Sequence, residues 1–215
     1  MNRTAPAARK IARRTGLLAA VASVALMVAP AAGIASAPVK FGAKLNPTVQ
    51  PSNSLPGLTC DQTAALGPAC TMIQNEAYGR PDGGELAPKT GTIKTIRVIA
   101  GGPGSFKLQI AKVKRSTEFT SNDAKVVYTG PKISYTGQTE ANYENDSYKV
   151  ESFPVNVPVR KGQQLALRGN ITSMIRCSSG GRNTLLYTPP LMSGGPFTAA
   201  GSTDGCWILM EAVIK

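Results

Sequence analysis

The sequence predicts an all-β protein, a sandwich of two antiparallel sheets with about seven to nine short strands. Short segments in which apolar and polar residues alternate recur along the chain, and turn residues separate them. The composition agrees, because 22 Gly and 16 Pro residues interrupt the chain and only 17% of its residues are charged, which disfavours long exposed helices. Alternating strands bury one face each, so two such sheets are needed to enclose a core.

Residues 1–35 have the three parts of a secretory signal peptide. A basic start is followed by an uncharged apolar run at 17–28 and by small residues up to Ala35. We expect cleavage after Ala35 by the general secretory route, since Arg13 and Arg14 fit a twin-arginine signal only loosely. A retained membrane anchor is the alternative, because the run is not far short of the roughly 20 residues that span a bilayer. The mature chain, 36–215, is then expected to be one secreted domain without a membrane span.

A first strand is predicted at 39–45 (VKFGAKL). Residues 92–100 and 105–113 are expected to form a hairpin around the turn GGPG, and two further strands to flank Gly130 and Pro131. Residues 206–214 (CWILMEAVI) are apolar on both faces, so this last strand is expected to lie centrally or to be covered on both sides.

An edge strand is predicted at 153–159 (FPVNVPV). Pro154 and Pro158 have the same parity, so their missing amide donors fall on one border of the strand, as an edge position allows. Lys161 and Gly162 then form the turn of an expected hairpin with 163–171. The alternation directs the prolines to solvent and four apolar residues to the core: Phe153, Val155, Val157 and Val159.

The four cysteines are an even number in an exported chain, which predicts disulfides among Cys60, Cys70, Cys177 and Cys206. The connectivity stays open from sequence, but pairing Cys60 with Cys70 and Cys177 with Cys206 closes the shortest loops and is preferred. Between the first two cysteines, residues 61–67 can form a short helical turn. At most this one helical turn is expected in the chain.

Three segments in this order carry a resemblance: TCDQTAALGPACTMIQ, GTIKTIRVIAGGPGSFKLQIAKV and FPVNVPVRKGQQLAL. The chain resembles a broad set of secreted, mostly actinobacterial β-sandwich proteins of jelly-roll type over about residues 39–215. The resemblance implies a jelly-roll-like fold and an exported bacterial protein. It supplies no catalytic residue.

The chain contains no histidine, which excludes Ser-His-Asp and Cys-His nucleophiles and histidine-ligated metals. We therefore expect a non-catalytic protein and assign neither a catalytic residue nor a cofactor. The alternative is a carbohydrate-active enzyme or glycan-binding module that uses the acidic, tyrosine-containing loop 136–151, whose carboxylates could act as a glycosidase pair. Glu140, Glu144 and Asp146 could also offer oxygen ligands to calcium, but their spacing does not match an EF-hand, so no metal is assigned.

Four tyrosines lie in or beside polar turns: Tyr135, Tyr143, Tyr148 and Tyr187. Phenol rings presented on a sheet can stack on sugar rings, which makes these residues candidates for glycan binding. The alternative is that they cover loops and strand ends.

The charge of the mature chain is moderately basic. Five of the 24 Lys and Arg residues and none of the 12 acids precede residue 36, which leaves a net charge of +7. The densest basic cluster is Lys112, Lys114 and Arg115. Such a surface could rest against anionic wall polymers or lipid head groups, or could simply be solvated. No aromatic residues interleave with the bases, so the expected partner is an extracellular glycan, cell-wall polymer or protein and not nucleic acid.

Overall fold

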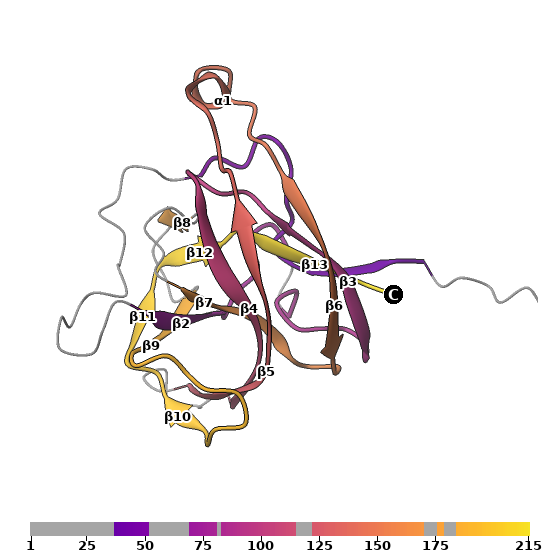
Figure 1. Cartoon of the computed structure of the whole chain (residues 1–215), viewed down its shortest axis with the longest axis vertical. Helices are drawn as coiled ribbons and strands as arrows, with labels where there is room; N and C mark the ends of the chain where they lie inside the picture. The colour runs from indigo at the N-terminus through magenta and orange to yellow at the C-terminus, as the bar shows by residue number, and fades with distance from the viewer. Residues whose placement is uncertain (1–36, 52–68, 81–82, 115–121, 170–175, 179–183) are drawn as a thin grey trace, which may run out of the picture. The chain divides into compact units, whose positions relative to one another are not determined.

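Two antiparallel sheets enclose the core in the computed structural model, which describes residues 37–51, 69–80, 83–114, 122–169, 176–178 and 184–215 (Figure 1). The first sheet has four strands in the order β1 (Val39–Gly42), β13 (Met210–Ile214), β3 (Gly91–Val98) and β6 (Glu151–Val159). The second has seven, in the order β10 (Thr198–Ala199), β5 (Asp123–Tyr135), β4 (Gly104–Lys114), β7 (Gln164–Gly169), β2 (Cys70–Gln74), β9 (Thr184–Tyr187) and β11 (Ser202–Asp204). The predicted all-β two-sheet sandwich is confirmed.

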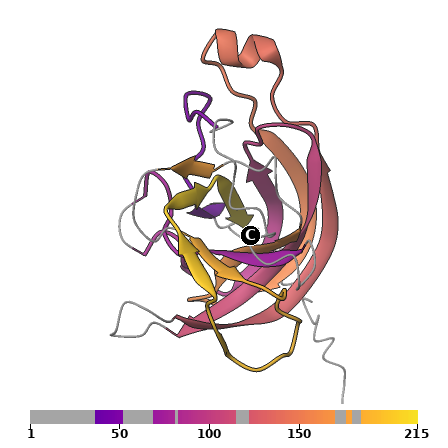
Figure 2. The same ribbon diagram turned by 90° about the vertical axis from the view of Figure 1, so that its left-hand side faces the viewer.

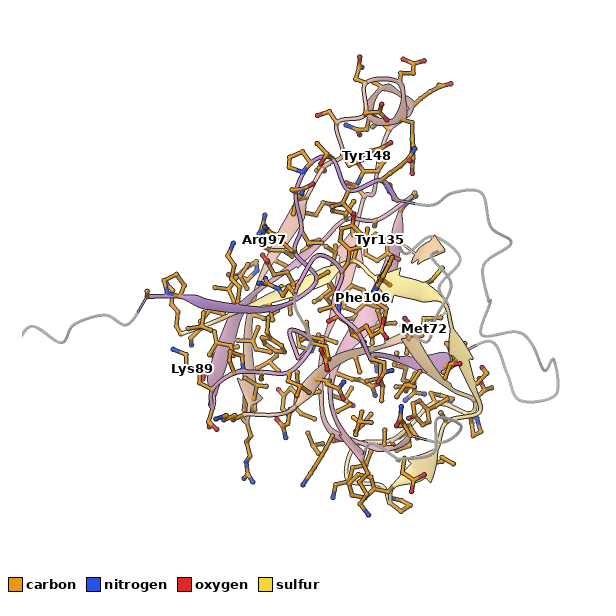
Figure 3. The ribbon with its side chains drawn as sticks, turned by 180° about the vertical axis from the view of Figure 1, so that it is seen from behind. Met72, Lys89, Arg97, Phe106, Tyr135 and Tyr148 are labelled. Atoms are coloured by element: carbon orange, nitrogen blue, oxygen red, sulfur yellow. The ribbon has the colours of Figure 1, made fainter. Side chains whose placement is uncertain are left out.

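The main core lies between the inner faces of the two sheets. Phe41, Ile96 and Met210 come from the four-stranded sheet, and each is almost completely buried. Met72 and Phe106 contribute from the seven-stranded sheet and are labelled in Figure 3. Each large apolar side chain that is fully buried stabilises the fold by about 1.5–3 kcal/mol. The long strands β4 and β5, paired in the seven-stranded sheet, curve side by side in Figure 2.

The two predicted hairpins are wrong, because each pair of strands is divided between the sheets. β3 belongs to the four-stranded sheet and β4 to the seven-stranded sheet, so the turn at 101–104 crosses from one layer to the other. β6 and β7 are separated in the same way. An alternating strand buries one face in either arrangement, so alternation alone does not identify its hydrogen-bonded neighbour.

The two strands expected on either side of Gly130 and Pro131 are one continuous strand, β5. Its register with β4 shifts between Lys107 and Gln109, which pair with Lys132 and Thr129. Two residues of β5 therefore oppose one residue of β4 at this point, which is a β-bulge. A bulge leaves a residue outside the regular ladder, and this accommodates the proline within the strand.

The predicted edge strand is confirmed, since β6 ends the four-stranded sheet in the described part of the chain. Pro154 and Pro158 are exposed, whereas Val157 and Val159 are buried. The register with β3 shifts between Ile93 and Thr95, which pair with Val157 and Pro154, so β6 also carries a bulge. The bulge was not predicted, because alternation of side chains does not reveal it.

The first and last strands of the chain differ in part from those predicted. β1 lies within the strand predicted at 39–45, and β13 is central between β1 and β3. The expected strand 206–214 is divided at Leu209 into β13 and β12 (Cys206–Ile208), and β12 pairs with β8 (Arg176–Ser178) in a separate ladder. These short pieces raise the number of strands in the described residues above the seven to nine predicted.

A short helix, α1 (Glu140–Glu144), lies in the loop before β6 and was not predicted. The helical turn expected at 61–67 and the signal peptide expected at 1–35 lie outside the described residues. No helix in the described ranges has the length and hydropathy needed to cross a membrane.

A buried carboxylate connects the strands of the four-stranded sheet. Glu211 in β13 is 2% exposed and accepts a hydrogen bond from Arg80 Nη2 at 2.7 Å and another from Arg97 Nη1 on β3. Lys40 Nζ on β1 lies 3.5 Å away, and Arg80 Nε also donates to the Gly42 carbonyl at 2.5 Å. A buried charge is tolerated only with such partners, so Glu211 links three strands to the loop that carries Arg80.

We predict that Glu211→Ala lowers the free energy of unfolding by about 3 kcal/mol, because two partly buried arginines lose their counter-ion. Urea denaturation at neutral pH measures the change. Glu144→Ala, at an exposed position in α1, is the control and should change stability by less than about 0.5 kcal/mol. Equal effects of the two substitutions would contradict the assignment.

Candidate functional site

The seven-stranded sheet is buried on both faces at β2 and β9, where residues 188–201, which we call the strap, cover part of its outer face. The strap contributes Leu191 to a second apolar cluster on this face, with these residues of the sheet: Ile73, Ala111, Ala124, Val126, Ala166, Leu185 and Tyr187. β2 and β9 are buried at every position as a consequence. Strands with two buried faces lack polar alternation, which is the one signal in the sequence for a second cover.

The strap is pinned to the sheet by the buried amide of Gln109 in β4. Gln109 Nε2 donates to the carbonyl of Leu191 at 3.2 Å, and Gln109 Oε1 accepts from Thr71 Oγ1 at 3.0 Å. The N–H of Leu191 in turn donates to Thr71 Oγ1 at 3.0 Å. A buried polar group needs partners, and this closed set of bonds satisfies the amide, the hydroxyl and the strap backbone together.

Backbone contacts hold the rest of the strap. The N–H of Gly194 donates to the Val126 carbonyl, and that of Gly201 to the Leu186 carbonyl, both at 3.0 Å. Between them, β10 pairs with the start of β5. The strap is therefore fixed near both of its ends and at its centre.

The strap also uses part of the basic cluster predicted from sequence. Lys114 Nζ lies 4.2 Å and Lys125 Nζ 4.9 Å from the centre of the Phe197 ring. Ammonium groups at this distance are attracted to the ring electrons. Arg115 lies outside the described residues. Lys114 thus has a packing role next to the strap.

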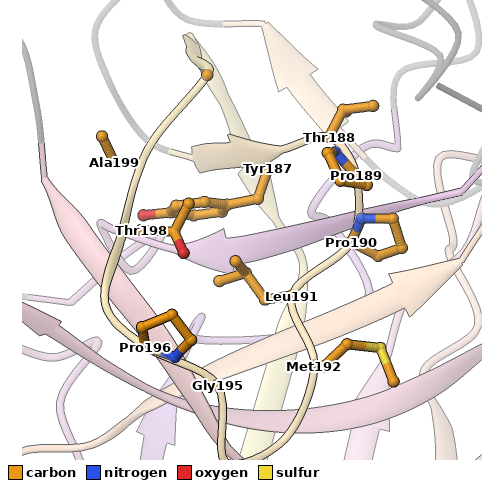
Figure 4. Close-up of a pocket in the computed structure, with 11 residues that line it drawn as sticks. Tyr187, Thr188, Pro189, Pro190, Leu191, Met192, Gly195, Pro196, Thr198 and Ala199 are labelled. Atoms are coloured by element: carbon orange, nitrogen blue, oxygen red, sulfur yellow. The ribbon is translucent and has the colours of Figure 1, made fainter. Parts of the chain in front are cut away.

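A small cavity lies between the strap and the sheet (Figure 4). Its volume is about 260 Å³, just below the usual range of ligand pockets. Its walls come from Tyr187, Thr188, Pro189, Pro190, Leu191, Met192, Gly195, Pro196, Thr198, Ala199 and Gly201. None of these side chains is a carboxylate, amine or thiol, so the lining can enclose an apolar group but supplies no acid–base pair.

Tyr187 lies inside the curve of the strap in Figure 4 and carries the one phenol of the cavity. Its hydroxyl donates to the Asn122 carbonyl at 2.9 Å. Burial, and to a smaller extent the nearby Asp123 carboxylate, raise the pKa of Tyr187. The phenol is therefore a neutral hydrogen-bond donor that anchors the floor of the cavity.

A line of basic residues continues from the strap across the same face, and we call it the basic row: Lys132 on β5, Lys107 on β4 and Arg168 on β7. Lys107 pairs in register with both Lys132 and Arg168. Lys107 has the same parity in β4 as Gln109 and Ala111, and Arg168 the same parity in β7 as Ala166, so all three cations lie on the outer face. On the next strands of the sheet, Arg168 pairs with Thr71 in β2, and Thr71 pairs with Tyr187 in β9. The line of paired residues therefore runs from the basic row to Tyr187 under the strap.

Two of the three cations of the basic row are exposed to solvent. Lys107 and Lys132 are exposed and Arg168 is half-buried. Among the described residues, no ion pair joins any of the three to a carboxylate. Arg168 Nη1 instead donates to Met192 Sδ at 3.4 Å, and Met192 is 63% exposed at the rim of the cavity. The cavity and the basic row are thus continuous through Met192.

The four candidate tyrosines do not form one surface. Tyr135, Tyr148 and Tyr187 are buried, and Tyr143 is half-buried. Tyr143 packs edge-on against Tyr148 and donates to the Gly101 carbonyl at 3.1 Å. Burial, followed by the hydrogen bond to Asp146, raises the pKa of Tyr148. In this conformation only Tyr143 keeps part of its ring in solvent, and glycan binding by these residues stays a prediction.

Polar residues of the loop 136–151 are used to fold the loop itself. The Glu151 carboxylate accepts the N–H of Thr136 at 3.1 Å and that of Gly137 at 2.7 Å. Gly137 has φ +73°, and a Cβ there would lie 2.4 Å from the backbone of Gly102, so glycine is required at this contact. The Gln138 side chain also bonds the carbonyls of Ala100 and Lys149, at 3.0 and 2.9 Å.

The three acids proposed for calcium are not gathered into a site. Glu140 and Glu144 are exposed on α1, and Asp146 Oδ1 accepts from the Tyr148 hydroxyl at 3.2 Å. No group of three metal-ligating side chains occurs in the part of the chain that the structure describes.

The cysteines are described in part. Cys70 and Cys206 are buried, in β2 and β12. β12 pairs with β8, which holds Cys177, but the register places Cys206 opposite Ser178 and Cys177 opposite Trp207. Cys60 lies outside the described residues. The predicted disulfides therefore stay predictions.

Comparisons of the chain with protein-family models, curated proteins and solved structures gave no match. The resemblance to secreted actinobacterial sandwich proteins stays a prediction, and the candidate site depends on its own geometry. Lys107, Lys132, Arg168 and Met192 were not predicted as site residues, because the basic row is assembled by register from strands far apart in the sequence.

We predict that Gln109→Leu lowers the free energy of unfolding by about 1–3 kcal/mol, because the Leu191 carbonyl loses its buried donor and Thr71 its acceptor. Amide hydrogen exchange should accelerate more in 188–201 than in β3 or β13. Unchanged protection of the Leu191 amide would contradict the anchoring role of Gln109.

We predict that Tyr187→Phe costs about 1 kcal/mol of stability at neutral pH through loss of the bond to Asn122. Because the folded pKa is raised, the neutral phenol stabilises the wild type below the unfolded pKa of about 10, and this contribution is lost as pH rises above it. Urea denaturation at about pH 7 and pH 11 should therefore show a smaller loss for Tyr187→Phe than for the wild type. A parallel loss would show that Tyr187 is not responsible.

Proposed function

We propose that this chain is an exported, non-catalytic binding protein and that the outer face of its seven-stranded sheet contacts a cell-surface polymer or a protein partner. The observation that carries the proposal is the division of this face into two parts. The strap covers the apolar part over β2 and β9 and leaves the basic row open on β5, β4 and β7.

The folding of the sheet does not account for the basic row. Like charges placed directly opposite one another on neighbouring strands are unfavourable, and Lys107 has such a neighbour on each side. A partner with anionic or hydrogen-bonding groups would offset that repulsion when bound. Met192 adds an exposed apolar contact next to the charges. Met and Arg, which meet at this point as Met192 and Arg168, are residue types that are enriched in protein interfaces.

The non-catalytic part of the proposal is supported by where the polar groups lie. The cavity is lined by apolar and hydroxyl-bearing residues. In the loop 136–151, Glu151 bonds the loop backbone, and Glu140 and Glu144 are exposed on α1. A glycosidase pair needs two carboxylates on either side of a sugar ring.

The proposed location is extracellular. We infer that residues 1–35 are a secretory signal peptide and that disulfides form among the four cysteines after export. The net charge of +7 on 36–215 suits attraction to anionic material at a bacterial cell surface.

We predict that Met192→Asp weakens retention of the mature protein on bacterial cell-wall material by about tenfold, because it introduces a charge at an exposed apolar contact. Sedimentation of the protein with washed wall fragments measures retention. Ser152→Asp adds the same charge at an exposed position of β6, on the other sheet, and should leave retention unchanged.

Equal retention of both variants, or no retention of the wild type, would contradict the proposal. Hydrolysis of a polysaccharide panel that is abolished by Glu140→Gln or Glu144→Gln would instead support the carbohydrate-active alternative.

A further inference from the structure

We propose that the basic row binds a linear polyanion that lies across the strands and places successive oxyanions against Lys132, Lys107 and Arg168. This inference depends on the proposed function and specifies the chemistry of its partner. The register puts the three cations on adjacent strands in one line. Neighbouring strands are about 4.8 Å apart, so an extended chain meets three positive charges over about 10 Å.

The end of the row at Arg168 is positioned by the strap. Its Nη1 donates to Met192 Sδ at 3.4 Å, and a thioether is a weak acceptor that leaves the charge of the guanidinium unpaired. The remaining N–H groups can bond two oxygens of one phosphate or carboxylate, whereas Lys107 and Lys132 act as point charges. Two residues away from the Lys107–Lys132 pair, Ser105 in β4 pairs with Ser134 in β5. Their two hydroxyl groups lie beside the cations on the same face.

The geometry favours a polymer over a single anion. An exposed cation gains little from one counter-ion in water. Once one anionic group of a polymer is bound, the neighbouring groups are held at a high effective concentration near the second and third cations. A polymer therefore binds more tightly than a free anion. An anionic membrane is disfavoured, because stable attachment needs apolar insertion as well as charge. Met192 is the one large apolar side chain that is exposed in the described ranges.

The test uses the mature protein and labelled linear polyphosphate, followed by fluorescence anisotropy at several salt concentrations. Lys107→Gln/Lys132→Gln should weaken binding by about tenfold or more at low salt. Lys94→Gln/Lys161→Gln removes the same charge from exposed positions off this face and should change binding less than about twofold. The slope of log K against log salt is negative, and its magnitude falls by about 0.7 for each lost contact, so the slope should change from about −2 in the wild type to about −0.7 in the first variant.

Misfolding of the test variant is excluded separately. Lys107 and Lys132 are exposed and repel each other, so their replacement should leave the urea midpoint unchanged or raise it. Inorganic phosphate should not compete at concentrations at which polyphosphate saturates the protein.

Equal weakening by the two double variants would overturn the inference, since it would show attraction to the net charge and not to the basic row. Tighter binding to phosphatidylglycerol vesicles than to polyphosphate would overturn it in favour of a membrane. If polyphosphate does not bind while Met192→Asp still weakens wall retention, the polyanion is wrong and the proposed function survives. If polyphosphate binds as expected while Met192→Asp and Ser152→Asp are retained equally, the basic row is supported and the wall partner is not.

Discussion

The buried amide of Gln109 is the contact on which the outer face of the seven-stranded sheet depends. It lies among small apolar side chains, where an unbonded amide would be costly, and the strap backbone supplies its partner. Once Leu191 is fixed, the chain on either side encloses the cavity and brings Met192 to Arg168. The second apolar cluster and the candidate site thus arise from the same hydrogen-bonded link, which joins positions more than eighty residues apart.

The positions of four acids are consistent with a basic row that forms no ion pair with a carboxylate of the described residues. Two carboxylates are consumed inside the fold: Glu211 holds two arginines and a lysine, and Glu151 organises the turn at 136–137. Glu140 and Glu144 lie on α1, outside the sheets. These four acids are therefore committed to the fold or placed on α1, and none of them forms an ion pair with the basic row.

The sequence was informative where a local rule decides the structure. Two prolines of like parity identified β6 as an edge, and apolar residues on both faces identified β13 as central. It was not informative about neighbours, since alternation states which residues share a face but not which strand lies beside them. For that reason the sequence predicts hairpins of β3 with β4 and of β6 with β7, although the partners lie in different sheets. The basic row depends on the register of three strands and was missed, whereas the run Lys112, Lys114 and Arg115 stood out only because it is contiguous.

In the described part of the chain, three of the four outermost strands of the two sheets, β6, β10 and β11, offer little to a second molecule, whereas β1 is a short edge strand of four residues. β6 carries two prolines and a bulge, and β10 and β11 span only two and three residues. A protein that gathers on a repetitive ligand reaches a high local concentration. Long exposed edge strands would then pair between molecules and could form fibrils. If copies of this protein gather on one polyanion as proposed, the edges at β6, β10 and β11 would disfavour strand pairing between neighbouring copies.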